Sequence, residues 1–325
     1  MKVCIIVPVY NAEKYIADCF RSIANQTYKN IEAVFVDDCS TDNSYNTLLE
    51  LKEGQKDGEI QYKIIKHEKN GGVHISRNTG ISEALNSGAD YMAFMDNDDV
   101  ITPNCIERLL SFTKKYPNAE IIQGAHFTLG EDNWLLPPNI SDQTWNGVWD
   151  IIYDKIIKSS IKKDFEEVLN GVEIIKFWLY YMRVYELIAL FGVWAALYKT
   201  DFIKKNDIRF SEDLPVTEDV WFRYLCFKNA AQIVIDHYPV YFYRARNNSY
   251  SAAAQEQYQR KYCWAVCLEK MLLDADNKEY SQLLLRWLFE WARFWAGELK
   301  TEKEKALLTR YLDILKRIGE KNRPE

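Results

Sequence analysis

Apolar runs alternate with amphipathic stretches through residues 1–128. Continuous apolar runs are typical of strands buried on both faces of a parallel sheet, and apolar residues recurring every three or four positions are typical of helices. The intervening stretches predict helices, among them one with Ile16, Phe20 and Ile23 on one face and one from about residue 73 to residue 86. The expected strands are residues 3–9, 30–36, 62–66, 91–95 and 120–128.

Strands that alternate with helices form mainly parallel sheets covered by helices on both faces, so we expect an α/β fold. Ligands of such folds bind beyond the carboxyl ends of the strands. Polar clusters follow four of the expected strands, so four strands deliver polar groups to one edge of the sheet. These clusters are residues 10–11, 37–38, 70–71 and 96–99.

The most distinctive of these clusters is Asp96-Asn97-Asp98-Asp99. Three carboxylates this close repel one another unless a positive group lies between them. A divalent cation, which takes oxygen ligands and often shares them with substrate phosphates, is the natural candidate. The alternative is a solvated acidic turn before a helix. The convergence of four strand ends on one edge favours the metal.

The loop after the first strand carries no glycine-rich phosphate-binding motif. The strand runs into Pro8-Val9-Tyr10, and neither GxGxxG nor GxxxxGK[ST] occurs in the sequence. Such loops hold phosphates on backbone amides. A bound diphosphate would therefore need another positive partner, which a metal on Asp96 and Asp98 would supply.

The pattern loosens after residue 128. Lysines and isoleucines interleave over residues 155–163, which fits either a basic helix on an anionic membrane or an ordinary solvated helix face. Strands are expected again at residues 193–198, 233–236 and 240–243.

Between these strands, Thr217, Glu218 and Asp219 suit a helix N-terminus, where the helix dipole favours carboxylates. Helix capping alone is the alternative interpretation.

The chain from residue 255 onward has a helical pattern. Trp287, Trp291 and Trp295 recur every four residues, which is typical of a packing face. This face could dock on the sheet, form a homodimer contact or touch lipid headgroups, and the sequence does not choose among these.

Composition narrows the class of protein. The net charge of -6 argues against a general nucleic-acid binder. Seven cysteines without a CxxC pair indicate neither a zinc site nor a disulfide framework, which fits a reducing cytoplasm. No apolar run is long enough to span a membrane, so no transmembrane helix is expected.

Several short motifs occur in the order and spacing of glycosyltransferase family 2, which this chain resembles. The resemblance is strong over residues 1–128 and weaker through Trp194, the Glu218-Asp219 pair and residues 243–249. It implies a GT-A fold with a mixed, mainly parallel sheet, a UDP-sugar donor, a divalent metal (Mn²⁺ or Mg²⁺) and inversion at the anomeric carbon. The motifs are residues 5–11 (IIVPVYN), 36–44 (VDDCSTDNS), 70–72 (NGG), 76–80 (SRNTG) and 95–99 (MDNDD).

Together with the helical pattern of the tail, the resemblance predicts three parts of the chain. Residues 1–128 would form the nucleotide-sugar-binding half of the GT-A domain. Residues 129–250 would recognise the acceptor and carry the catalytic base, and residues 251–325 would form a helical C-terminal extension.

The donor site carries over residue by residue. Pro8, Val9 and Tyr10 would line the nucleobase pocket, and Asp38 would accept a hydrogen bond from the uracil imide. The turn at Asn70 and Gly71 would also contact the donor.

The family usually has glycine at the position of Cys39. We therefore expect this turn to avoid a positive φ.

The remaining site residues follow the same resemblance. Arg77 would stand near the diphosphate or brace the acidic motif, and Asp96, followed by Asn97, would sit by the ribose. Asp98 would hold the metal, with Asp96 beside it, and Asp99 is a rival for either role.

Asp219 resembles the general base of the family and Glu218 accompanies it. The implied reaction is a direct displacement in which an acceptor hydroxyl attacks the anomeric carbon.

The implied acceptor is a glycan or a lipid-linked glycan, which a cytoplasmic enzyme could reach by peripheral contact with the membrane. Two other readings remain. A catalytically silent nucleotide-sugar-binding or scaffold protein would keep the pocket without turnover. A nucleotidyltransferase would carry a glycine-rich basic loop after the first strand, which is absent here.

Overall fold

The protein is described from a computed structural model. It describes residues 1–55, 60–130, 166–171, 173–176, 178, 192–214, 216–246 and 256–275, with isolated positions between 281 and 317. Residues 155–163 and the tryptophans at 287, 291 and 295 lie outside the described residues, so their predicted roles stay predictions.

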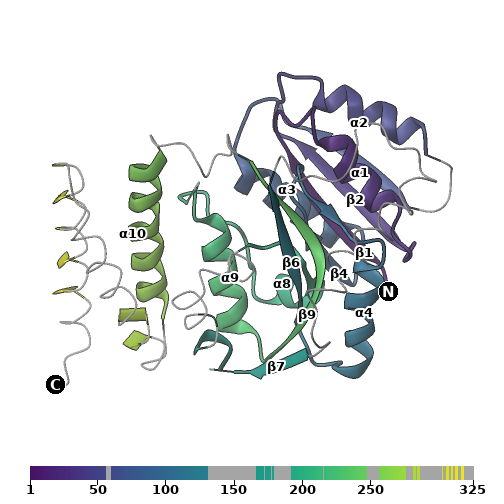
Figure 1. Cartoon of the computed structure of the whole chain (residues 1–325). Coiled ribbons are helices and arrows are strands. Elements are labelled where there is room, and N and C mark those ends of the chain that lie inside the picture. Colours follow the sequence, from purple (N-terminus) through teal and green to yellow (C-terminus); the bar gives the residue numbers. More distant parts are fainter. Residues whose placement is uncertain are drawn as a thin grey trace.

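A single sheet of nine described strands organises the chain (Figure 1). The strand order is β3-β2-β1-β4-β8-β6-β9-β5, and β7 pairs with β9. The strands are β1 (Val3–Val9), β2 (Ile31–Asp37), β3 (Gln61–Lys66), β4 (Tyr91–Phe94), β5 (Val100–Ile101), β6 (Ile121–Gly130), β7 (Glu166–Asn170), β8 (Ala196–Lys199) and β9 (Gln232–Ala245).

The first four strands, β1 to β4, pair with one another in parallel. All four lie within a residue or two of their predicted bounds, so the predicted parallel unit is confirmed. In the second half β8 runs antiparallel to both β4 and β6, whereas β6 and β9 are parallel. The sheet is therefore mixed, and its antiparallel pairs all involve β8 or β9.

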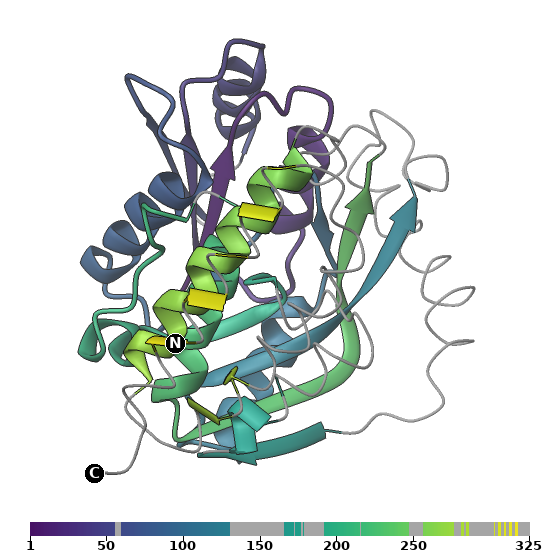
Figure 2. The same cartoon turned by 90° about the vertical axis from the view of Figure 1, so that its left-hand side faces the viewer.

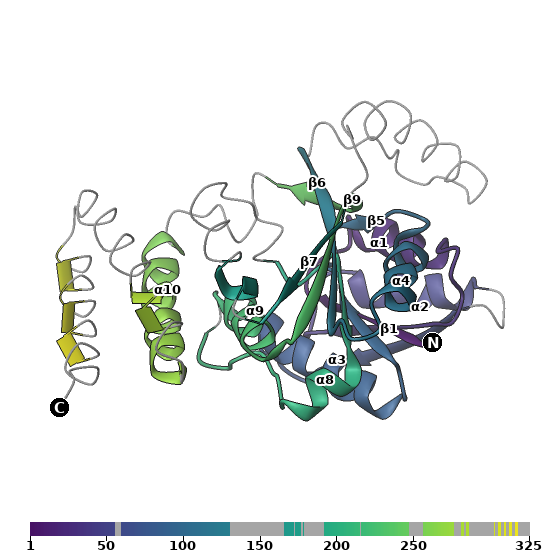
Figure 3. The same cartoon turned by 90° about the horizontal axis from the view of Figure 1, so that it is seen from below.

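Helices cover both faces of the sheet (Figure 3). Successive residues of β1 point to opposite faces, and both sets are fully buried. One face packs on α1 (Ile16–Ala24), α2 (Ser44–Glu53) and α4 (Cys105–Lys115), and the other on α3 (Val73–Asn86), α8 (Thr200–Lys205) and α9 (Glu218–Asn229).

Helix α10 (Glu256–Asp274) packs on the outside of α9. Figure 2 looks onto α10 with the sheet behind it.

Residues 233–236 and 240–243, predicted as two strands, form one continuous strand, β9. Pro239 lies where the register between β6 and β9 shifts, opposite Ala125. A proline lacks the N–H that a regular ladder needs, so it is tolerated at such an irregularity. The long strand carries Tyr241 and Arg244 toward the acidic motif, and Arg246 follows directly after it.

Helix α3 approaches β1 very closely. A Cβ atom on Gly80 would lie 2.2 Å from Cγ2 of Ile6, so no larger residue fits without a shift. This contact seats α3 on the middle of β1, and Arg77, one helical turn before Gly80, lies toward the edge where the polar clusters gather.

No helix in the described part of the chain is both long and apolar enough to cross a membrane.

Candidate active site

The ends of β1, β2 and β3 form one polar corner. The N–H of Asp38 donates to the carbonyl of Val9 (2.8 Å), and the side chain of Asn70 donates to the carbonyl of Asp38 (3.2 Å). Tyr10 beside them is about half exposed. The structure therefore brings together the residues predicted to hold the nucleobase, with an aromatic ring open to solvent.

The carboxylate of Asp38 is itself heavily bonded. It accepts hydrogen bonds from the backbone N–H groups of Gly71 (3.0 Å) and Gly72 (2.7 Å), and Nδ1 of His67 lies 2.9 Å away. Asp38 thus fixes the turn that begins α3. Its role toward a uracil stays a prediction. His67 was missed from the sequence, where a lone histidine after a strand gives no signal.

The expectation for Cys39 is wrong. Its φ is 63°, in the left-handed region that glycine usually supplies. The Cys39 thiol donates to the carbonyl of Glu68 (3.6 Å), and Ser40 N–H donates to Asp37 (3.2 Å). The turn is therefore kept in its left-handed form despite the side chain, at some cost in backbone strain.

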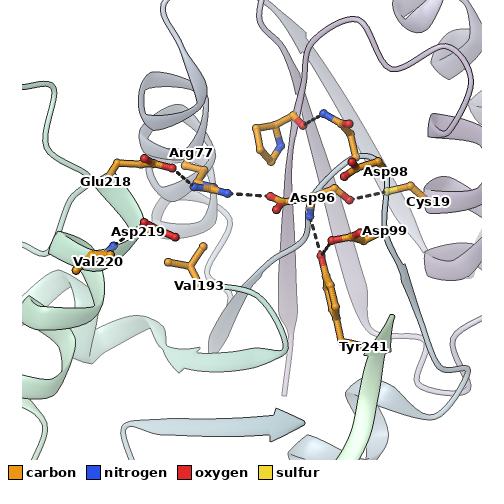
Figure 4. Close-up of polar contacts among 12 residues, drawn as sticks. Cys19, Arg77, Asp96, Asp98, Asp99, Val193, Glu218, Asp219, Val220 and Tyr241 are labelled. Atoms are coloured by element: carbon orange, nitrogen blue, oxygen red, sulfur yellow. Dashed lines mark hydrogen bonds and ion pairs between the residues drawn. The ribbon is translucent and has the colours of Figure 1, made fainter. Parts of the chain in front are cut away.

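Hydrogen bonds to two different strands anchor the start of the acidic motif (Figure 4). The side chain of Asn97 donates to the carbonyl of Pro8 (2.8 Å), and the N–H of Asp96 donates to the Tyr241 hydroxyl oxygen (3.1 Å). The motif is thereby fixed against β1 on one side and β9 on the other.

Asp98 and Asp99 have different environments. Asp99 is fully buried and accepts hydrogen bonds from the Tyr241 hydroxyl (2.6 Å) and the Arg244 N–H (2.7 Å). Asp98 is partly exposed and forms an ion pair with Arg246 (2.7 Å). Burial raises the pKa of Asp98 to about 6, against the opposing charge of Arg246. Asp98 is thus the more accessible carboxylate, and Asp99 is engaged by protein donors.

A divalent cation would find two accessible carboxylates here, those of Asp96 and Asp98. Among the described residues there is no group of three or more His, Cys, Asp and Glu side chains able to hold a metal alone. Mg²⁺ and its relatives commonly bind through one or two carboxylates and complete their shell with substrate phosphates and water. The residues present fit such a shared site.

Arg77 connects the acidic motif to the second acidic cluster (Figure 4). Its Nη2 donates to Asp96 (2.8 Å) and its Nη1 donates to Glu218 (2.9 Å). The two carboxylates together raise the pKa of Arg77 against the effect of its burial. One guanidinium therefore joins two groups of acids that lie far apart in the sequence. The bond to Asp96 agrees with the bracing alternative for Arg77, whereas the sequence does not predict the bond to Glu218.

Asp219 lies next to this bridge and outside it. Its carboxylate accepts a hydrogen bond from the N–H of Val220 (2.8 Å), and it forms no ion pair with any described residue. Burial raises the pKa of Asp219 to about 6, opposed by the charge of Arg77. Burial also raises the pKa of Glu218, whose carboxylate is taken up by Arg77. Of the two acids, Asp219 is the one available to accept a proton.

Sequence comparison identifies a family. The model of "Glycosyl transferase family 2" matches residues 4–187. Glycosyltransferase GlyA of Streptococcus pneumoniae serotype 4 is 30% identical over 258 residues, which cover 79% of this chain and 32% of GlyA. The chain thus spans about a third of the length of this relative.

Solved structures give the same fold. The S. aureus TarS 1–349 complex with UDP-GlcNAc has a TM-score of 0.70 at 22% identity, over 98% of this chain and 83% of that one. A mannosyltransferase from Pyrobaculum calidifontis, in complex with GDP-Man and Mn²⁺, has a TM-score of 0.51 at 12% identity, over 99% and 86%.

Proposed function

This chain belongs to glycosyltransferase family 2, and from that premise we propose that it transfers a sugar from a UDP-sugar to an acceptor hydroxyl with inversion. The fold is of the GT-A type, as the resemblance implied. TarS, a neighbour in fold, binds UDP and UDP-GlcNAc, which supports a UDP-linked hexose or N-acetylhexosamine as donor.

The observation that carries this proposal is the Arg77 bridge. It places the acidic motif, where a donor diphosphate and metal are expected, beside the pair of acids on α9. A nucleotide-binding protein without turnover needs only the first cluster. The second cluster adds a carboxylate whose pKa of about 6 suits a base near neutral pH.

In the proposed reaction Asp219 takes the proton of the acceptor hydroxyl. The hydroxyl oxygen forms a bond to the anomeric carbon as the bond to the diphosphate breaks, and UDP leaves with the electron pair from the opposite face. Arg77 keeps Asp96 and Glu218 in place during this step. A divalent metal bound by Asp98 and Asp96 would neutralise charge on the departing diphosphate.

Replacing Asp219 with Asn tests the base. We expect the transfer rate to fall by about 100- to 10,000-fold, the usual contribution of a general base. Binding of UDP, followed as the rise in melting temperature with nucleotide and Mn²⁺, should stay close to that of the wild type. Near-normal transfer by Asp219→Asn would refute the assignment. No stabilisation by any nucleotide would favour a protein that does not use nucleotide sugars.

The proposal also covers the acceptor and the location of the enzyme in the cell. We propose a glycan or lipid-linked glycan as acceptor and a cytoplasmic enzyme with peripheral membrane contact. Recognition would fall to residues 129–215, of which the largest part lies outside the described residues. A flotation assay with anionic liposomes tests the membrane contact, and a protein that stays at the bottom of the gradient argues against it.

A further inference from the structure

Hydrogen bonds join the main-chain carbonyls of α10 to side chains of the α9 segment. Three side chains from the α9 segment donate hydrogen bonds to α10 carbonyls, and the contacts follow the same order along both helices. The two helices therefore run in the same direction, side by side (Figures 1 and 3). The bonds are Thr217 to Cys263 (3.3 Å), Tyr224 to Met271 (3.1 Å) and Lys228 to Asp274 (2.9 Å).

The first of these bonds involves the residue before the two acids. Thr217 occupies the N-cap position of α9, where a threonine oxygen normally accepts a hydrogen bond from the first turn. Here it makes no such bond, and its hydroxyl donates to Cys263 instead. The N–H of Val220, which would donate to a capping hydroxyl, donates to the carboxylate of Asp219. The side chain of Thr217 is thus committed to α10.

Thr217 is also enclosed by α10. The residue is 1% exposed, and the thiol of Cys267, one turn after Cys263, lies 4.0 Å from its carbonyl oxygen. Both Cys263 and Cys267 are buried at this contact. The turn that begins α9 therefore meets two successive turns of α10.

We infer that Thr217 is a positioning residue, which holds the Glu218–Asp219 turn against α10 and makes this helix part of the catalytic apparatus. The inference rests on the proposed role of Asp219. Because Asp219 has no ion-pair partner among the described residues, the main chain of its own turn sets the position of its carboxylate. A displacement of about 1 Å at a reacting group can cost about 100-fold in rate.

Two substitutions separate the hydroxyl from the shape of the side chain. Thr217→Val removes the donor at almost constant volume, and Thr217→Ser keeps it. The matched control is Thr113→Val, because Thr113 is a buried threonine whose hydroxyl donates to a carbonyl in its own helix, α4, away from α10. Tyr224→Phe removes the second α9–α10 bond, about one and a half turns from the acids.

Two quantities are measured. The first is the rate of UDP release, with water as acceptor, from the UDP-sugar that the wild type turns over fastest. The second is the rate of hydrogen exchange at the backbone amides of residues 218–220. For Thr217→Val we expect kcat to fall about 10- to 100-fold with an unchanged donor KM, and exchange to speed up at these amides. Thr217→Ser should restore both. Thr113→Val and Tyr224→Phe should leave kcat within about twofold, whatever they do to the melting temperature.

Two results would overturn the inference. One is unchanged exchange at residues 218–220 in Thr217→Val. The other is faster exchange with an unaltered kcat, which would make the bond structural only. Failure of the proposed function is separate, since it would appear as normal turnover by Asp219→Asn in the same assay.

Discussion

The two acidic clusters joined by Arg77 are held in different ways. The motif at residues 96–99 is held by groups from distant parts of the chain, among them Pro8, Tyr241 and Arg246. The pair on α9 is held by Arg77 at Glu218, while Asp219 bonds only to the backbone of its own turn among the contacts described. Cations and a hydroxyl group balance the negative charge of the first cluster. In the second cluster one carboxylate, that of Asp219, has no ion-pair partner among the described residues.

This difference separates binding from chemistry. A carboxylate with fixed partners holds its geometry and suits the binding of a metal or a diphosphate. The half-buried Asp219 can take up a proton without breaking an ion pair with any described residue, and burial raises its pKa to about 6. The contrast predicts that removing a partner affects chiefly stability or metal binding at the first cluster, and catalysis at the second.

Breaking the bridge itself should have the largest effect. Arg77→Met leaves the buried Glu218 without its cation and frees Asp96. Loss of one partner of a buried ion pair typically costs 3–5 kcal/mol, and the partial exposure of Asp96 places this case at about 3 kcal/mol. Urea unfolding measures the change. Arg77→Lys should recover only part of the lost free energy of unfolding, because an ammonium group cannot donate to both carboxylates in the geometry of a guanidinium. Wild-type stability in Arg77→Met would contradict the bridge.

The second-largest effect is expected from removing the Tyr241 hydroxyl, which bonds to Asp99. Tyr241→Phe removes the hydroxyl that donates to Asp99 and accepts from the Asp96 N–H. Leaving a buried acceptor short of a donor costs about 1–3 kcal/mol in the free energy of unfolding. Tyr198→Phe is the control, because the buried Tyr198 hydroxyl donates to a neutral carbonyl, that of Val193 (3.0 Å). Equal losses in the two variants would mean that Asp99 does not depend on Tyr241.

The pH dependence probes the second cluster. Because the pKa of Asp219 is raised to about 6, the base is deprotonated above that pH and protonated below it. We expect kcat/KM to rise about tenfold per pH unit up to roughly pH 6 and then to level off. The residual activity of Asp219→Asn should lose this rise. A profile that is flat between pH 5 and 7 in the wild type would assign the proton transfer elsewhere.

The smallest effect concerns the ion pair of Asp98 with Arg246. A partly exposed pair contributes about 1 kcal/mol or less, so a cation that competes with Arg246 gains at most about fivefold. Arg246→Ala should therefore bind Mn²⁺ up to about fivefold more tightly without nucleotide, measured by electron paramagnetic resonance. Lys63→Ala, which removes a cation from an exposed pair with Glu83, should not change Mn²⁺ binding. Weaker binding in Arg246→Ala would refute this competition.

The sequence predicts best what depends on near neighbours. Strand β1 and helix α3 were placed to the residue, because continuous apolar runs and a flexible turn at Gly72 are local signals. Strand β7 was missed, because its five residues carry two glutamates and its only described strand partner is β9, more than 60 residues away. No local pattern reports such a pairing.

The site follows the same rule. The motif carrying Asp96 and Asp98 is visible as a cluster, but the distinction between Asp98 and Asp99 depends on Tyr241 and Arg244, which β9 delivers from more than 140 residues away. The turn at Cys39 was misjudged for another reason. The bonds of the surrounding loop impose a backbone conformation that its own residue type disfavours.

Cys39 also offers a practical handle on the protein. The other six cysteines are buried, and burial raises their thiol pKa values, which makes them poor nucleophiles. A maleimide dye should therefore label the native protein at one position, next to Asp38. A fluorophore there would report on nucleotide binding without any cysteine being removed, and an occupied donor pocket should slow the labelling reaction.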